Sequence, residues 1–210
     1  MIDLYTWTTP NGRKVSIMLE EAGLPYVVHP VNIGENEQFA SAFLKISPNN
    51  RIPAIVDRDA DDGPLPVFES GAILIYLAEK TGKFFAAKGA QRAKTLEWMM
   101  WQMSGVGPMF GQLNHFANAA PDRISYAIER YASEAARLIA VLDKRLGEAQ
   151  FLGGDYSIAD MITYPWILPA LDPIAGMKPE IAGEAANVRR WLAEVGARPA
   201  VRRGMAVPTL

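Results

Sequence analysis

Residues 49–77 constrain the fold of this chain more than any other segment. They read NNRIPAIV, a short polar stretch and FESGAILIYL, which predicts a proline-bearing loop, two strands and a helix. The strands are expected at 54–57 and 65–68, and the stretch 58–64 between them has the Asp, Gly and Pro content of a hairpin loop. Because the second strand leads straight into a helix N-terminus, this layout suits an anionic, extended ligand held largely by backbone groups.

The preceding residues predict a β-α-β start. Ile2–Thr6 is a short apolar strand, and apolar residues then recur at helical spacing until Gly23 stops the pattern. A second strand is expected over 27–31, and a helical turn or short helix over 39–44. The first part of the chain should therefore mix strands and helices.

Strand signals vanish after Arg92. Over 128–142 apolar residues step by three and four, which predicts a helix with one buried face that Gly147 terminates. The aromatic and methionine-rich stretch 98–116 favours a kinked helix in the core, and residues 157–160 form a capping-box pattern with a structural role. The expected organisation is an α/β domain over 1–80, a linker over 81–89 and an all-helical domain over 90–210.

Charge and composition limit the classes of partner. The formal net charge of −2 and an isoelectric point near 5.8 come with interspersed acids and bases, so no basic stripe is present for nucleic acid or anionic lipid. The N-terminus lacks the basic start and apolar core of a signal peptide, and no apolar run is long enough to span a bilayer. We expect a cytoplasmic protein that binds neither nucleic acid nor membrane.

The chain contains no cysteine and only two histidines, His29 and His115. Disulfides, thiolate metal sites and a cysteine nucleophile are thereby excluded, and neither a zinc site nor a Ser-His-Asp triad is expected. Any sulfur redox chemistry performed by this protein must use sulfur atoms that arrive with its ligands.

Thr9 and Asn11 follow the first strand in the sequence TTPNG. Pro10 suits the first turn of a helix and Thr9 suits the cap before it, so the unpaired backbone donors there could receive an anionic thiolate. The spacing alone favours a simpler interpretation, in which Thr9 only caps the helix and Asn11 only shapes the turn.

Pro53 stands at the start of the expected third strand, where it removes one hydrogen bond from the sheet. A cis Ile52–Pro53 bond would turn the Ile52 backbone outward, so that its N–H and C=O could pair with a peptide-like ligand. Since only about 5–6% of X–Pro bonds are cis, the sequence favours an ordinary trans proline.

Glu69 and Ser70 precede the apolar run Ala72–Leu77, and helix capping alone would explain both residues. In a functional interpretation, the Ser70 hydroxyl and nearby N–H groups take a ligand carboxylate, and Glu69 takes a ligand ammonium. That arrangement would fit an α-amino acid head group.

Arg130 lies one helical turn after Tyr126 in the second half of the chain. It could bind a ligand, or it could pair with Glu134 at the same spacing on a solvated face. The pattern alone favours the ion pair.

Together these segments resemble the cytosolic glutathione transferases. Over essentially the whole chain, the strings TPNGRKV, SPNNRIPAIVD, FESGAILIYLAEKTG, GPMFGQ, AIERY and LGGDYSIAD are similar to the Nu class of bacterial members. The resemblance implies an α/β plus all-α fold, with an N-terminal thioredoxin-like domain and a C-terminal all-helical domain. It also implies a homodimer.

The same resemblance implies which residues contact glutathione. Thr9 and Asn11 would address the glutathione sulfur, and they are the expected catalytic residues. The expected substrate-binding residues are Gln38 and Arg51 at the glycyl end, the backbone of Ile52 with Pro53 at the cysteinyl unit, Glu69 and Ser70 at the γ-glutamyl head, and Arg130 from the helical domain.

The class that the chain resembles is associated with glutathione-dependent reduction of disulfides more than with conjugation to aryl halides. A chain without cysteine can catalyse this reduction only by binding two glutathione units, or one glutathione and a mixed disulfide. We therefore expect a disulfide oxidoreductase that uses glutathione as co-substrate and no metal. Two alternatives stay open: a conventional transferase or glutathione peroxidase acting on an apolar electrophile or hydroperoxide, and a non-catalytic glutathione-binding regulatory protein.

Overall fold

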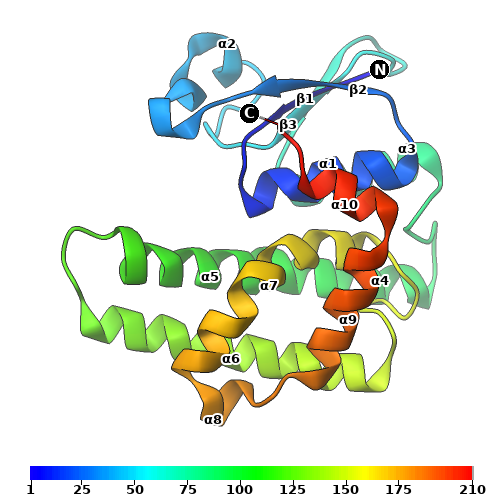
Figure 1. Cartoon of the computed structure of the whole chain (residues 1–210). Coiled ribbons are helices and arrows are strands. Elements are labelled where there is room, and N and C mark those ends of the chain that lie inside the picture. The colour runs from blue at the N-terminus through cyan, green and yellow to red at the C-terminus, as the bar shows by residue number, and fades with distance from the viewer. Residues whose placement is uncertain (210) are drawn as a thin grey trace. The chain divides into compact units, whose positions relative to one another are not determined.

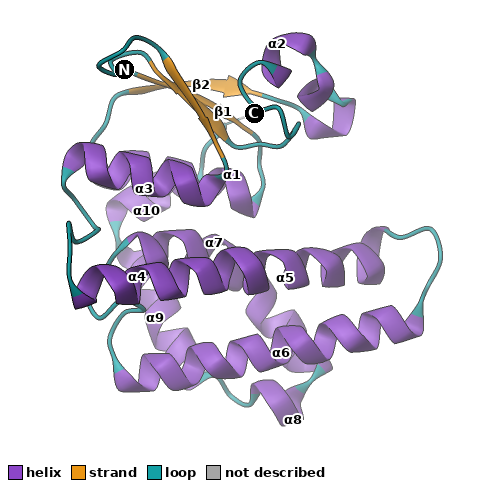
Figure 2. Cartoon of the chain, turned by 180° about the vertical axis from the view of Figure 1, so that it is seen from behind, coloured by secondary structure: helices purple, strands orange, loops and turns teal. Residues whose placement is uncertain are grey.

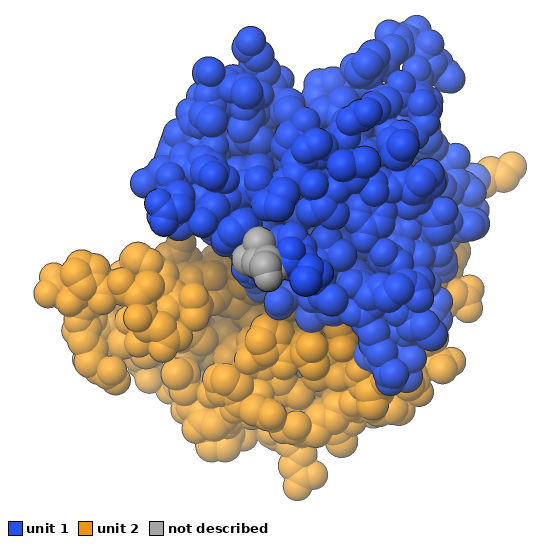
Figure 3. Space-filling view, turned by 45° about the horizontal axis from the view of Figure 1, so that its top comes forward, with its two compact units in different colours: residues 1–87, 196–210 blue, residues 88–195 orange. Residues whose placement is uncertain are grey.

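A computed structural model of the chain describes residues 1–209. The chain forms two compact units, residues 1–87 with 196–210 and residues 88–195 (Figure 3). The last residues thus group with the first unit, although they follow the helical half in the sequence. The expected domain bounds, 1–80 and 90–210 with a linker between them, stay a prediction.

A four-stranded sheet forms the centre of the first unit. Its strands are β1 (Ile2–Thr6), β2 (Tyr26–Pro30), β3 (Ala54–Asp57) and β4 (Leu65–Phe68), in the order β2-β1-β3-β4. β1 pairs with β2 in parallel, whereas β3 is antiparallel to both β1 and β4. This mixed sheet confirms the thioredoxin-like fold, and the hairpin strands have the bounds that the sequence predicted.

The helices of the first unit are α1 (Pro10–Ala22), α2 (Ser41–Leu44), α3 (Ser70–Thr81) and α10 (Pro199–Met205). α1 and α3 pack against each other on one face of the sheet, and α10 lies along α1 (Figures 1 and 2). Neighbouring strand residues face opposite sides, so Leu4 is buried in the core while Tyr5 contacts Phe43 of α2, with ring centroids 6.2 Å apart. α2 therefore covers the other face.

The C-terminal helix α10 is tied closely to α1. A Cβ atom on Gly204 would lie 2.6 Å from Ile17 Cα, so the two backbones approach each other at a distance that only glycine permits. Ser16 Oγ donates to the Gly204 carbonyl at 2.6 Å. Two ion pairs, Arg198 with Glu21 and Arg203 with Glu20, connect the same two segments.

The second unit is helical, as predicted. Its helices are α4 (Ala90–Trp101), α5 (Gly107–Asn114), α6 (Ser125–Glu148), α7 (Ile158–Met177), α8 (Pro179–Ala182) and α9 (Ala186–Ala197). Gly147 does not terminate α6, because the helix runs on to Glu148 and Ala149 takes the C-cap position. The expected interruption within 98–116 is a π-helical segment at Gln102–Val106, and a second one follows α5 at His115–Ala119.

The capping box at the start of α7 is confirmed. The Ser157 side chain accepts from the helix backbone, and Asp160 accepts from the Ser157 N–H at 3.0 Å. Asp160 also accepts from Trp191 Nε1 at 2.9 Å, and burial raises its pKa to about 6. None of the helices described over residues 1–209 combines the length and apolarity that a membrane span requires.

Candidate functional site

Three segments meet at one edge of the sheet in the first unit. Tyr5 of β1 pairs with Ala54 of β3, and Ala54 pairs with Phe68 of β4. Because β3 is antiparallel to both neighbours, the end of β1, the start of β3 and the end of β4 share this edge. The topology therefore places three groups of predicted residues at one edge: Thr9 and Asn11 after β1, Arg51 to Pro53 before β3, and Glu69 with Ser70 after β4.

The first of these segments is the N-terminus of α1. Thr9 has extended backbone and its Oγ1 accepts from the Gly12 N–H at 3.1 Å, which confirms that Thr9 caps the helix. A Cβ atom on Gly12 would lie 2.4 Å from both Thr6 Oγ1 and the Trp7 carbonyl oxygen. The loop after β1 is therefore folded tightly onto the first turn, which also carries the half-buried Asn11.

The second segment is the loop that enters β3. The Ile52–Pro53 bond is cis, so the trans bond that its general frequency favoured is wrong here. Ser47 Oγ donates to the Arg51 carbonyl at 2.8 Å and holds the loop, while the Arg51 side chain is exposed. The half-buried Ile52 packs against a core cluster of Val31, Phe43 and Ala54.

The third segment is the N-terminus of α3. Glu69 occupies the cap position with φ 69° and ψ 114°, and its side chain makes no capping hydrogen bond. It accepts instead from Asn49 Nδ2 at 3.4 Å. The interpretation of Glu69 as a side-chain cap is therefore wrong, since Glu69 makes no capping hydrogen bond and its positive φ differs from the extended backbone of a usual N-cap residue.

Lys14 was missed by the sequence reasoning. It lies on α1 with only 1% of its surface exposed, and its Nζ donates to Ser70 Oγ at 3.4 Å. Burial lowers the pKa of Lys14 to about 7, and the negative charge of Glu69 opposes that shift. The available signal was a cation one helical turn before the apolar Met18, on a face that should be buried.

Gln38 follows β2, whose end is joined to the end of β1 by the hydrogen bond from Val31 N to Thr6 O, 2.9 Å. Gln38 is 8% exposed, and its Oε1 accepts no hydrogen bond within the described residues. Buried acceptors in proteins are normally paired. An unpaired one is what a ligand-binding side chain would present to a donor.

Arg130 lies exposed on α6, in the second unit. The Glu134 carboxylate is bound by both Arg137 Nε and Arg137 Nη2 at 2.8 Å. The favoured ion pair between Arg130 and Glu134 is therefore replaced by one between Glu134 and Arg137. The contact of Arg130 with a ligand stays a prediction.

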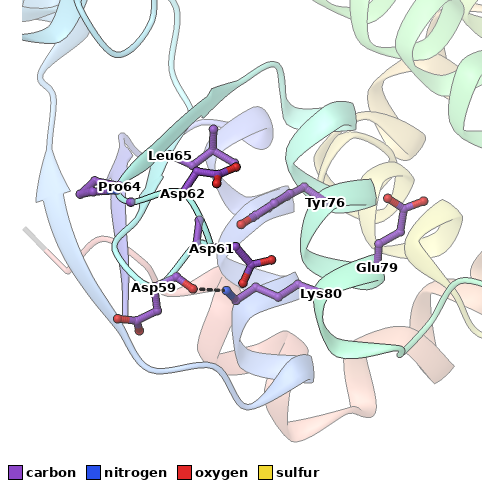
Figure 4. Close-up of a pocket in the computed structure, with 10 residues that line it drawn as sticks. Asp59, Asp61, Asp62, Pro64, Leu65, Tyr76, Glu79 and Lys80 are labelled. Atoms are coloured by element: carbon purple, nitrogen blue, oxygen red, sulfur yellow. Dashed lines mark hydrogen bonds between the residues drawn. The ribbon is translucent and has the colours of Figure 1, made fainter.

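A cavity of about 600 Å³ in the first unit lies elsewhere, between the β3–β4 loop and α3 (Figure 4). Two of its lining residues, Tyr76 and Lys80, bind the carboxylate of Asp57, which lies at the end of β3 opposite to the site: Tyr76 OH at 2.6 Å and Lys80 Nζ at 2.7 Å. These contacts anchor the hairpin. Within residues 1–209, no group of three or more His, Cys, Asp or Glu side chains is placed to hold a metal ion.

Comparison with known families agrees with the fold. Residues 8–80 match the model of the glutathione S-transferase N-terminal domain, and residues 125–194 match that of the C-terminal domain. The chain belongs to the glutathione S-transferase family.

Two individual relatives within this family share a name that states an activity. The chain is 49% identical over 208 residues to the disulfide-bond oxidoreductase YfcG of Escherichia coli K12, covering 98% of this chain and 94% of that protein. It is 44% identical over 218 residues to the disulfide-bond oxidoreductase YghU of the same organism, covering 98% and 74%.

Two solved structures superpose with TM-scores of 0.91. One is a glutathione transferase from Pseudomonas putida with one glutathione disulfide bound per subunit, 43% identical, covering 99% of this chain and 91% of that one. The other is a glutathione transferase from Burkholderia graminis with two glutathione molecules bound per subunit, 46% identical, covering 99% and 88%.

Proposed function

We propose that this protein catalyses the glutathione-dependent reduction of disulfides by thiol–disulfide exchange. The observation that carries the proposal is that three segments predicted to bind glutathione lie at one sheet edge in a chain without cysteine. Relatives named as disulfide-bond oxidoreductases, and solved relatives that hold glutathione disulfide or two glutathione molecules, support it.

Each part of glutathione has a matching group at this edge. The α3 N-terminus, with the Ser70 hydroxyl and its backbone N–H groups, suits the γ-glutamyl carboxylate, and the neighbouring Glu69 carboxylate suits the ammonium. The Ile52 backbone pairs with the cysteinyl unit as a short added strand. Gln38 and Arg51 bind the glycyl end, Pro53 fixes the Ile52 backbone, and Arg130 is a further ligand contact that the family resemblance implies.

In the reaction, a glutathione thiolate attacks the glutathionyl sulfur of a mixed disulfide. A new S–S bond forms as the old one breaks, and the departing thiolate takes up a proton. One glutathione and one mixed disulfide thus yield glutathione disulfide and a free thiol. Both reacting sulfurs arrive with the ligands, so the protein contributes position and charge stabilisation.

Activation of the thiol alone is a small effect. Lowering the pKa of bound glutathione from about 8.5 to about 6.5 raises its thiolate fraction at pH 7 roughly 25-fold, but the weaker nucleophile loses about 8-fold of that gain. The net is about threefold, so alignment of the sulfurs and stabilisation of the leaving thiolate supply most of the rate.

The proposal assigns the stabilisation of thiolate charge to Thr9 and Asn11. Thr9 Oγ1 already accepts from Gly12 N–H, but a hydroxyl has two acceptor lone pairs and one donor. Capping therefore leaves the Thr9 O–H able to donate to a thiolate, so Thr9 can cap the helix and contact the ligand sulfur at once. Asn11 offers an amide donor from the same helical turn.

The direct test is turnover with glutathione and a small mixed disulfide. We expect Asn11→Ala to lower kcat by about tenfold or more, and Asn11→Asp to lower it further because its charge repels the thiolate. We expect Glu69→Gln to raise KM more than it lowers kcat, because Glu69 binds ground state and transition state alike.

An inactive parent protein would overturn the proposal. Strong conjugation of aryl halides with negligible disulfide turnover would select a conventional transferase instead. A melting temperature raised by glutathione, with no turnover in any of these assays, would select a regulatory binding protein.

We also propose a cytoplasmic homodimer. The dimer is consistent with the family to which the chain belongs. Light scattering that gives the mass of one chain would contradict the dimer, and recovery of the protein outside the cytoplasmic fraction would contradict the location.

A further inference from the structure

Arg13 lies in the first turn of α1, which also carries Asn11 and is capped by Thr9. Its backbone N–H donates to the Thr9 carbonyl at 3.1 Å, so Arg13 lies one helical turn after Thr9 on the same face. Side chains of a helix lean toward its N-terminus. The Arg13 side chain therefore extends toward the helix end at which the proposed function places the reacting sulfurs.

The guanidinium of Arg13 lacks a partner within the protein. The side chain is half-buried, and its Nε is shielded from solvent without a hydrogen-bond acceptor in the described part of the chain. No carboxylate among residues 1–209 forms an ion pair with it. The first turn of α1 thus holds a positive charge that the described chain does not neutralise by a direct contact.

This arrangement is unusual for an arginine. Buried donors are normally paired, and a guanidinium stays charged at neutral pH, so its partial removal from water is unfavourable without an anion. Arg198, the other half-buried arginine of the first unit, shows the normal arrangement: its Nε and Nη2 bind the Glu21 carboxylate at 2.6 and 2.9 Å. Arg13 therefore lacks the kind of anion that Arg198 has.

We propose that Arg13 binds a carboxylate on the departing half of the disulfide substrate, which makes the protein selective for mixed disulfides between glutathione and an anionic thiol. This inference rests on the proposed function. In the first unit, the charged side chains which that function assigns to glutathione are Glu69, at the ammonium, and Arg51, at the glycyl end. Arg13 is not among them, so it is left for the half of the disulfide that departs.

The chemistry of a guanidinium fits a carboxylate ligand. Its planar fork of N–H donors binds a carboxylate through two parallel hydrogen bonds, and the unpaired Nε of Arg13 can supply one of them. The substrate would then give Arg13 the same kind of partner that Glu21 gives to Arg198.

Arg13 should act on substrate binding more than on the chemical step. In the exchange, the glutathione thiolate attacks the glutathionyl sulfur, the S–S bond of the substrate breaks, and the anionic thiol leaves as a thiolate that takes up a proton. The carboxylate of that thiol keeps its charge throughout. Arg13 therefore binds ground state and transition state alike, and its contact should lower KM rather than raise kcat.

A pair of mixed disulfides of glutathione isolates this contact. The departing half of one is 3-mercaptopropanoate, and that of the other is the neutral 3-mercaptopropanamide, which has nearly the same shape. Each enzymatic rate is divided by the uncatalysed rate of the same disulfide with glutathione, which removes differences in intrinsic reactivity. We expect the parent protein to show a corrected kcat/KM about tenfold or more higher for the propanoate disulfide, the size of a hydrogen bond to a charged group, and mainly through a lower KM.

Substitutions of Arg13 should remove the preference without removing turnover. Arg13→Gln should reduce the preference to about twofold or less, and should leave the propanamide disulfide within about twofold of its rate with the parent. Arg13→Lys keeps the charge but loses the planar fork, so it should retain part of the preference. Arg202→Gln is the matched control, since it removes an exposed arginine of the same unit whose Nε donates to the Gly196 carbonyl at 2.9 Å, and it should keep the full preference.

The outcomes distinguish a failure of the proposed function from a failure of the role of Arg13. A parent protein that turns over neither disulfide overturns the proposed function itself. A parent that turns over both at equal corrected rates overturns the role of Arg13 alone, and this comparison requires no variant. The same conclusion follows from an Arg13→Gln variant that keeps the preference or slows both disulfides equally, since a purely structural arginine would affect both substrates alike.

Discussion

The N-termini of α1 and α3 lie at the same sheet edge but are completed in different ways. At α1, Thr9 has extended backbone and its own side chain caps the helix at 3.1 Å. At α3, Glu69 has a positive φ of 69° and caps nothing with its side chain. At this second helix end, the buried Lys14 donates a hydrogen bond to Ser70, the first residue of α3.

This difference assigns different tasks to the two ends. A helix N-terminus leaves backbone N–H groups without partners, and Thr9 satisfies one of them within the protein. At α3 the residue in the cap position makes no side-chain capping bond, and the proposed function assigns the backbone N–H groups of that end to a ligand carboxylate. Under the proposed function, the first end combines helix capping with a catalytic hydroxyl, and the second end serves ligand binding.

Of the substitutions considered, removal of Lys14 should change the free energy of unfolding most. It also removes the buried ammonium that distinguishes the α3 end from the α1 end. Lys14→Met should raise the free energy of unfolding at pH 7 by at most about 4 kcal/mol, because the folded pKa of about 7 lies well below the value of about 10.4 for an unperturbed lysine, and the lost hydrogen bond to Ser70 reduces that gain. Denaturant unfolding of both proteins across a pH series measures this.

The pH dependence has a definite sign. Because the folded pKa is lowered, the unfolded chain binds more protons between about pH 7 and 10, and the stability of the parent rises with pH over that window. The difference in free energy of unfolding between Lys14→Met and the parent should therefore be largest below pH 7 and should shrink toward zero near pH 10. A variant less stable than the parent at pH 7 would show that Lys14 stabilises the fold.

A methyl group on Gly12 should break the α1 end. Gly12→Ala places Cβ 2.4 Å from Thr6 Oγ1 and from the Trp7 carbonyl oxygen, and the backbone contact cannot be relieved by a rotamer change. We expect a loss of about 3 kcal/mol from such overpacking, measured by denaturant unfolding. Gly176→Ala on α7 is the control, since nothing lies within 4 Å of its new Cβ and alanine favours helix.

Local features of the sequence were sufficient to predict much of the fold. The strand bounds at 54–57 and 65–68, the cap at Thr9 and the capping box at Ser157 depend on residues a few positions apart. Hydrophobic periodicity, turn residues and helix-capping preferences act over that range, so these elements can be predicted from a single sequence.

Features that depend on distant contacts were not predictable. Lys14 and Ser70 are 56 residues apart, so the helical spacing of Lys14 could suggest a buried face but not which distant residue it contacts. The close packing of Gly204 on Ile17 joins the last helix to the first unit in the same way. For Glu69, general cap preference was overridden by a left-handed backbone that tertiary structure holds.

The smallest effect should come from Thr9, and it tests whether the two helix ends differ as described. Thr9→Ala removes the acceptor for Gly12 N–H and should lower the free energy of unfolding by about 1 kcal/mol, whereas Thr9→Ser keeps the hydroxyl and should restore most of it. Glu69→Ala, at an end without a side-chain cap, should cost less than Thr9→Ala in the same measurement. Equal losses at both positions would mean that the α3 end is also closed by its own side chain.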